Sequence, residues 1–267
     1  MDTTVEDICR WVEEWAPSDW AEEGDRVGLQ FGSRRARVRH LGLALELSPA
    51  VAQWVQQEGI DLLLTHHPVF FHPLRRLCAE DPWEGLLLAL VRQGLTVVSY
   101  HTNLDVAPGG VTEVLAEGLG LEVKEALRPG RAGDPRVGLG RMAEAPEPVP
   151  VTRLARRLAA LVKAPVFITD HEEKLVRLVA LCAGSGADLL PEVLQKGAEV
   201  YITGDVKHHA ARAAEVAGLT LVVSDHYALE NYFWRGLASK IAQQFPQIQV
   251  SYFPGRSPLR LLNEEVP

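Results

Sequence analysis

Histidine and acidic side chains gather after three separate apolar runs of the chain. Only nine histidines occur in the 267 residues, so four of them at such positions favour a shared site over isolated structural histidines. Mixed imidazole and carboxylate donors suit zinc, iron, manganese or nickel better than calcium, which takes oxygen ligands. The sequence therefore predicts a metal site. Its candidate ligands are His66, His67, His101, Asp105, His226 and Glu230.

Two of these clusters share the spacing His-x-x-x-acid. Residues four apart fall on one face of a helix, so the histidine and the acid can reach one ion. A carboxylate in the first turn after a strand, as expected for Glu230, has two oxygens and can bridge two cations. Two ions about 3.5–4 Å apart can generate a hydroxide and polarise an oxygen or carbonyl. Glu230 and His101 are the candidate catalytic residues.

Several nearby groups leave two interpretations open. Asp25 is either a group that orients a ligand or a turn residue, whereas Asp205 and His208 either enter the site or form a polar helix start. The amides of Gly184-Ser185-Gly186 could hold an anion, although two glycines alone favour a tight packing turn. With Lys207, these groups favour an anionic small-molecule substrate.

Alternating strand and helix signals must position these side chains. Ser48-Pro49 and Asp81-Pro82 each supply an N-cap and a first-turn proline. Gly59 and Gly94 are expected to end the two helices, and apolar strands follow at 60–65 and 95–101. Such order is typical of an α/β protein with a mainly parallel sheet, in which ligands gather at the carboxyl ends of strands.

An internal repeat divides the chain. Residues 128–135 are rich in proline and glycine and residues 144–150 are rich in proline, which predicts a domain boundary near Leu127. The stretch 59–67 aligns with 197–205, and 94–105 aligns with 218–230 when one gap is allowed. We therefore expect two similar α/β domains that arose by duplication, with the candidate ligands at strand ends in both.

Composition excludes several classes of function. A net charge of −8 argues against a general nucleic-acid or anionic-membrane binder. Three cysteines without a CxxC pair suit a reducing compartment. The acidic start lacks the features of a secretory signal, and no apolar run approaches the ~18 residues that a membrane span needs. A cytoplasmic location is expected.

Four ordered motifs resemble the Nif-three-like family, whose members are often labelled GTP cyclohydrolase 1 type 2 homologues. They cover nearly the whole chain and read Leu64-Thr65-His66-His67-Pro68, Tyr100-His101-Thr102-Asn103-Leu104-Asp105, Ile202-Thr203-Gly204-Asp205 and Asp225-His226-Tyr227-Ala228-Leu229-Glu230. A fifth motif around Asp25 departs from the family pattern, because Gly24 and Arg26 stand where the family has Trp and Asn.

The resemblance implies two divalent ions per chain. It places His67 and Asp105 on one ion, His66 and His226 on the other, Glu230 between them and His101 alongside. It also implies a first domain of residues 1–127 plus 226–267, a second domain of residues 128–225, and a toroidal homohexamer.

These observations predict a metal-dependent hydrolase of a phosphorylated small molecule or nucleotide. The metallo-β-lactamase-like hydrolases would show His-x-His-x-Asp-His on one loop, and that motif is missing here. A non-enzymatic metal-binding scaffold or regulator would use the same ligands and is the alternative.

Overall fold

The computed structural model describes residues 2–169 and 173–259, which form two compact units. The first unit comprises the residues up to Gly110 together with Phe233–Gly255, and the second comprises Val111–Tyr232 and a segment that starts at Arg256. Residues 260–267 of the expected first domain lie outside the described part. Every helix in the described part is too short or too polar to cross a membrane.

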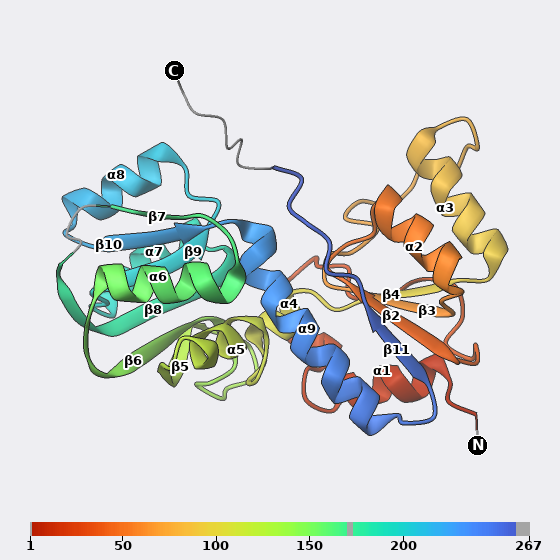
Figure 1. Cartoon of the computed structure of the whole chain (residues 1–267), viewed down its shortest axis with the longest axis horizontal. Coiled ribbons are helices and arrows are strands. Elements are labelled where there is room, and N and C mark those ends of the chain that lie inside the picture. The colour runs from red at the N-terminus through yellow and green to blue at the C-terminus, as the bar shows by residue number, and fades with distance from the viewer. Residues whose placement is uncertain (1, 170–172, 260–267) are drawn as a thin grey trace. The chain divides into compact units, whose positions relative to one another are not determined.

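The first unit is built on a five-stranded sheet in the order β1-β4-β3-β2-β11, in which only β1 is antiparallel. Helices α2 and α3 pack on one face, and α1 and the later part of α9 lie on the other (Figure 1). The strands are β1 (Gly28–Phe31), β2 (His40–Ala44), β3 (Leu62–Thr65), β4 (Thr96–Ser99) and β11 (Gln249–Tyr252). The helices are α1 (Val5–Glu13), the 3-10 turn η1 (Ser18–Trp20), α2 (Pro49–Glu58), α3 (Pro82–Gln93), α4 (Thr102–Val106) and part of α9 (His226–Gln244).

The helix ends follow the predicted capping signals. The Ser48 hydroxyl accepts a hydrogen bond from the Val51 amide at the start of α2, and the Asp81 carboxylate accepts hydrogen bonds from two backbone amides at the start of α3. Gly59 and Gly94 end these helices in the left-handed conformation, with φ of 64° and 85°. Glycine adopts this conformation without steric cost, so each helix stops where the next strand must begin.

The second unit contains a six-stranded sheet in the order β5-β6-β8-β9-β10-β7. Strands β8, β9 and β10 are parallel to one another, whereas β7 pairs antiparallel with β10, β6 with β8, and β5 with β6. The strands are β5 (Glu122–Pro129), β6 (Gly138–Pro150), β7 (Val166–Ile168), β8 (Leu175–Ser185), β9 (Val200–Gly204) and β10 (Thr220–Ser224). The helical elements are α5 (Val111–Gly118), α6 (Val151–Val162), η2 (Ala187–Leu189), α7 (Leu190–Gln195) and α8 (His208–Val216).

Helices α7 and α8 share one apolar cluster with the second sheet. On the other face, Glu113 of α5 pairs with the buried Arg141 of β6 at 3.0 Å. The boundary expected near Leu127 falls within β5. Of the stretches that predicted it, residues 128–135 end β5 and lead through a turn to β6 of the same sheet, and residues 144–150 lie within β6. Their composition therefore reflects a strand-to-strand turn and a strand end, and not a linker.

The two sheets repeat one design. The order β1-β4-β3-β2 with an antiparallel β1 corresponds to β7-β10-β9-β8 with an antiparallel β7. The Asp61 carboxylate accepts the amides of Arg39–His40 at 2.8 and 3.0 Å, and Glu199 accepts those of Arg177–Leu178 at 2.7 and 2.8 Å. Asp61 and Glu199 lie 138 positions apart, and so do the residues whose amides they bind. The predicted repeat therefore includes a hydrogen-bonded contact between neighbouring strands.

Candidate metal centre

The candidate ligands of the first unit lie at the carboxyl ends of β3 and β4. These parallel strands pair Thr65 with Ser99, so the residues that follow them emerge at the same edge of the sheet. One ring nitrogen from each of His66, His67 and His101 lies within 4.8 Å of the others. The structure therefore brings together three of the predicted histidines.

Each of these imidazoles is oriented through its Nδ1 atom. His66 is fully buried, and its Nδ1 lies 2.9 Å from the backbone oxygen of Tyr100. A carbonyl only accepts, so Nδ1 is the donor in this contact. The Nδ1 of His67 lies 3.0 Å from Glu46 Oε2. Oxygen acceptors behind a histidine are the usual means of presenting its other nitrogen to a metal.

His101 has the same arrangement, with Asp25 as its acceptor. Its Nδ1 lies 3.0 and 3.1 Å from the two Asp25 oxygens, which also accept the amide and hydroxyl of Thr102. Burial raises the pKa of Asp25, but the bonds from His101 and Thr102 outweigh it and hold that pKa well below its usual range. Burial lowers the pKa of His101, whereas Asp25 and Asp105 raise it and prevail. Asp25 thus orients His101 and is more than a turn residue.

Asp105 of α4 lies beside the first histidine of the pair. Its Oδ1 is 3.6 Å from His66 Nε2. His101 itself precedes α4 as its N-cap, so the His-x-x-x-acid spacing carries Asp105 one helical turn onward. Both side chains therefore stay at the edge of the sheet where β3 and β4 end.

The second unit supplies His226 and Glu230 from the first turns of α9. The Nε2 of His226 lies 3.1 Å from Glu230 Oε2, as the spacing of four residues in a helix predicts. Its Nδ1 lies 2.6 Å from Asp205 Oδ2. Hydrogen bonding to Glu230 is the main reason that the pKa of His226 rises to about 9, and Asp205 adds to it. The same two side chains belong to a group that could hold a metal ion.

The backbone around Glu230 leaves little room for its carboxylate to move. Glu230 is 4% exposed, and a Cβ added to Gly184 would lie 2.0 Å from its Oε1. Gly184 has a φ of +75°, which also favours glycine. Asp205 adopts a left-handed φ of 52°, which is uncommon for a residue other than glycine and places its carboxylate behind His226.

The remaining predicted residues take different roles. The Gly186 amide donates to Thr203 Oγ1, and its carbonyl accepts from Tyr201, so this turn is tightly packed and that amide has no capacity left for an anion. Lys207 and His208 are exposed at the start of α8. Glu46 was not predicted, although it follows the apolar strand β2 as the other acids follow theirs.

The donor set fits a transition metal or zinc. All four histidines have Nδ1 against an oxygen atom, and carboxylates of Asp105 and Glu230 lie beside two of the Nε2 atoms. Neutral imidazole and carboxylate are ligands that these ions accept. The first unit thus has a group of three histidines that could hold a metal ion, and the second unit supplies the His226–Glu230 pair.

The chain resembles known proteins over most of its length. The family model of Duf34/NIF3 (NGG1p interacting factor 3) matches residues 3–256. A GTP cyclohydrolase 1 type 2 homolog from Lactococcus lactis is 32% identical over 241 residues, which cover 89% of this chain and 91% of the relative. A relative of the same name from Methanocaldococcus jannaschii is 32% identical over 229 residues and 85% of this chain, with 89% of its own length covered.

Solved structures show the same fold. Reduced HcgD from Methanocaldococcus jannaschii matches with a TM-score of 0.82 and 27% identity, over 94% of this chain and 98% of its own. A Bacillus cereus protein related to NIF3 matches with a TM-score of 0.90 and 20% identity, over 98% of this chain and 100% of its own.

Proposed function

The chain belongs to the Duf34/NIF3 family, and on this premise we propose that it binds two divalent metal ions in one centre and hydrolyses a small phosphorylated molecule. The proposed ligands are His66, His67, Asp105, His226 and Glu230, with Glu230 shared by both ions. The observation that carries the proposal is the common orientation of the four histidines, each held at Nδ1 by an oxygen atom. His40, a histidine outside the proposed centre, also has Nδ1 against an oxygen atom, but its Nε2 contacts the Ser251 hydroxyl and lies beside no carboxylate of the described residues.

The residues around this centre have distinct parts in the proposed reaction. Two divalent ions, when bound, would activate water and polarise the substrate. Asp205 and Glu46 fix the rings of His226 and His67, so those ligands are preorganised. His101, whose pKa Asp25 and Asp105 raise against the effect of burial, is proposed to hold and release a proton at Nε2.

An anionic substrate is supported by the start of α8. Lys207 is the N-cap of this helix, and its side chain makes no capping bond. It stands two positions after Asp205, which contacts His226. A helix N-terminus with a nearby lysine favours a negatively charged group such as phosphate. GTP is the first substrate to test, because relatives carry the cyclohydrolase name.

Elemental analysis tests the metal centre. We expect about two divalent ions per chain in the purified protein and a loss of metal in the variant His67→Ala/Glu230→Ala. His72→Ala is the matched control, since His72 is an exposed histidine on the same segment. Full metal content in the double variant would contradict the assignment.

Turnover distinguishes the enzyme from a metal-binding scaffold. Metal-loaded protein is assayed against GTP, other nucleotides and neutral amides, with Glu230→Gln as the inactive variant. Turnover of a phosphorylated substrate that Glu230→Gln abolishes supports the hydrolase. Bound metal without turnover of any substrate favours the scaffold, and the expected assembly of identical copies is then measured by light scattering.

A further inference from the structure

Helix α6 carries three arginines on its exposed face. Val151, Leu154, Ala155 and Leu158 are buried beneath the helix, whereas Arg153, Arg156 and Arg157 are exposed. Like charges three or four positions apart on a helix repel each other, and cations are unfavourable near a helix N-terminus. All three arginines lie in the first seven residues of α6. The arrangement therefore costs stability unless an anion compensates it.

Other arginines of the same unit have acidic partners. Arg128 contacts Asp188 and Glu192, and Arg141 contacts Glu113. Within residues 2–169 and 173–259, the three α6 arginines make neither a hydrogen bond nor an ion pair. Their positive charge is thus available to a ligand at this surface.

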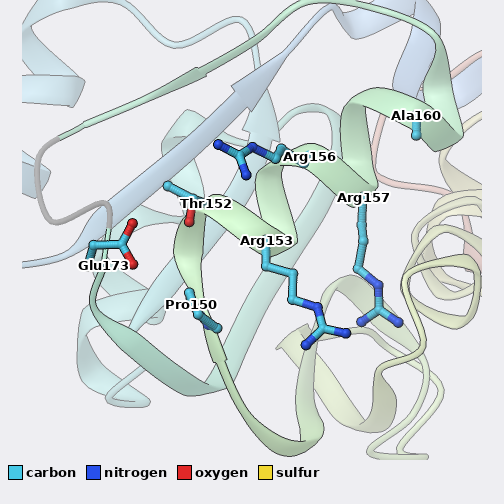
Figure 2. Close-up of a pocket in the computed structure, with 7 residues that line it drawn as sticks. All are labelled: Pro150, Thr152, Arg153, Arg156, Arg157, Ala160 and Glu173. Carbon is cyan, nitrogen blue, oxygen red and sulfur yellow. The ribbon is translucent and has the colours of Figure 1, made fainter.

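A cavity of about 510 Å³ lies against these side chains. Arg153 and Arg157 extend from the helix in the same direction, as residues four apart do, whereas Arg156 extends away from them (Figure 2). The cavity is also lined by Thr152 and Glu173. Arg157 reaches the turn after α5, where its Nη2 lies 3.8 Å from the position of a Cβ on Gly120. Arg153 and Arg157 are both exposed and line the cavity, so a compact ligand can reach both guanidinium groups.

We propose that Arg153 and Arg157 bind the phosphate group of a small phosphorylated molecule in this cavity. Guanidinium groups match phosphate oxygens in paired hydrogen bonds, and the cavity volume lies within the roughly 300–1,000 Å³ of small-molecule sites. The Glu173 carboxylate and the net charge of −8 disfavour a long polyanion such as nucleic acid. The lining residues include no metal-ligand candidate, so the site stands independently of the proposed hydrolase activity.

Calorimetric titration with inorganic pyrophosphate tests this site. The full chain is titrated as purified and again after chelation, because pyrophosphate also binds metal ions. We expect binding that survives chelation and weakens roughly tenfold or more in Arg153→Gln/Arg157→Gln. Glutamine keeps the helix propensity of arginine. Lys163→Gln removes one charge from the end of the same helix, outside the cavity, and should leave the affinity unchanged.

Several results would overturn the proposal. Pyrophosphate binding that disappears on chelation would assign the anion to the metal centre. An unchanged affinity in the double arginine variant would show that the pair does not bind phosphate. Tighter binding of a single-stranded oligonucleotide, or a double variant that changes its oligomeric mass, would assign the arginines to nucleic acid or to a contact between copies of the chain.

Discussion

Replacing Gly184 by alanine should remove metal by displacing a single carboxylate. The new Cβ would lie 2.0 Å from Glu230 Oε1, and contacts below 3.0 Å do not persist, so the carboxylate must retreat by about 1 Å. Metal–oxygen bonds of about 2.0–2.2 Å cannot stretch that far. Loss of a group that supports a metal ligand typically lowers metal affinity by roughly 10–100-fold. We expect a loss of at least this size, because here the ligand itself is displaced.

Stability must be separated from this effect. Alanine in the left-handed conformation costs about 1–2 kcal/mol, which lowers the melting temperature by roughly 2–8 °C in a chain of this size. Gly218→Ala is the matched control, because Gly218 has a φ of +72° and its added Cβ would meet nothing within 4 Å. The control should show the same left-handed penalty and retain its metal.

The assay is metal content and dissociation constant for both variants at equal protein concentration, with melting temperatures recorded in parallel. Glu230 is buried, so its carboxylate cannot simply swing into water. If Gly184→Ala held metal as tightly as Gly218→Ala, the placement of Glu230 as a ligand against this glycine would be wrong.

Three further changes have distinct expected outcomes. His101→Gln should lower kcat and abolish the fall of kcat at basic pH, while most of the metal is retained. Parallel loss of metal would make His101 a ligand. Asp205→Asn keeps a residue type that tolerates the left-handed conformation, and should weaken metal binding about 10–100-fold in a competition titration with little change in melting temperature. Burial raises the pKa of Glu199, but hydrogen bonds from two backbone amides outweigh this effect and lower that pKa. The Glu199 carboxylate therefore stabilises the fold above its unfolded pKa, and this stabilisation is lost as pH falls through its folded pKa. Denaturant midpoints measured from pH 7 down to pH 3 should fall less steeply in Glu199→Gln than in the unchanged protein.

Local sequence signals predicted most of the fold because they act over a few residues. Ser48, Asp81, Gly59 and Gly94 each set a helix end through a side chain or a conformation of their own. The repeat was visible for the same reason, since both copies keep a glycine before each apolar strand and polar residues after it. The extent of the units was harder, because β5 pairs with β6 through a turn whose composition resembles a linker.

The site divides in the same way. The rule that polar residues follow apolar strands found the histidines and their acids, and applied to β2 it would have found Glu46. It could not show that Nδ1 of each histidine is bound, because the acceptors of His66 and His101 lie 34 and 76 positions away in the chain. The role of Gly184 depends on the folded chain, since nothing near it in sequence indicates Glu230.

The sheet of the first unit depends on a strand made at the other end of the chain. His40 of β2 contacts Ser251 of β11, 211 positions later. Until β11 is synthesised, one edge of β2 has no partner strand, and unpaired strand edges pair readily with strands of other chains. Every strand of the second unit lies within residues 111–232 and is translated earlier. The second unit can therefore fold first on the ribosome, and a chain interrupted after residue 232 would leave the first unit a strand short.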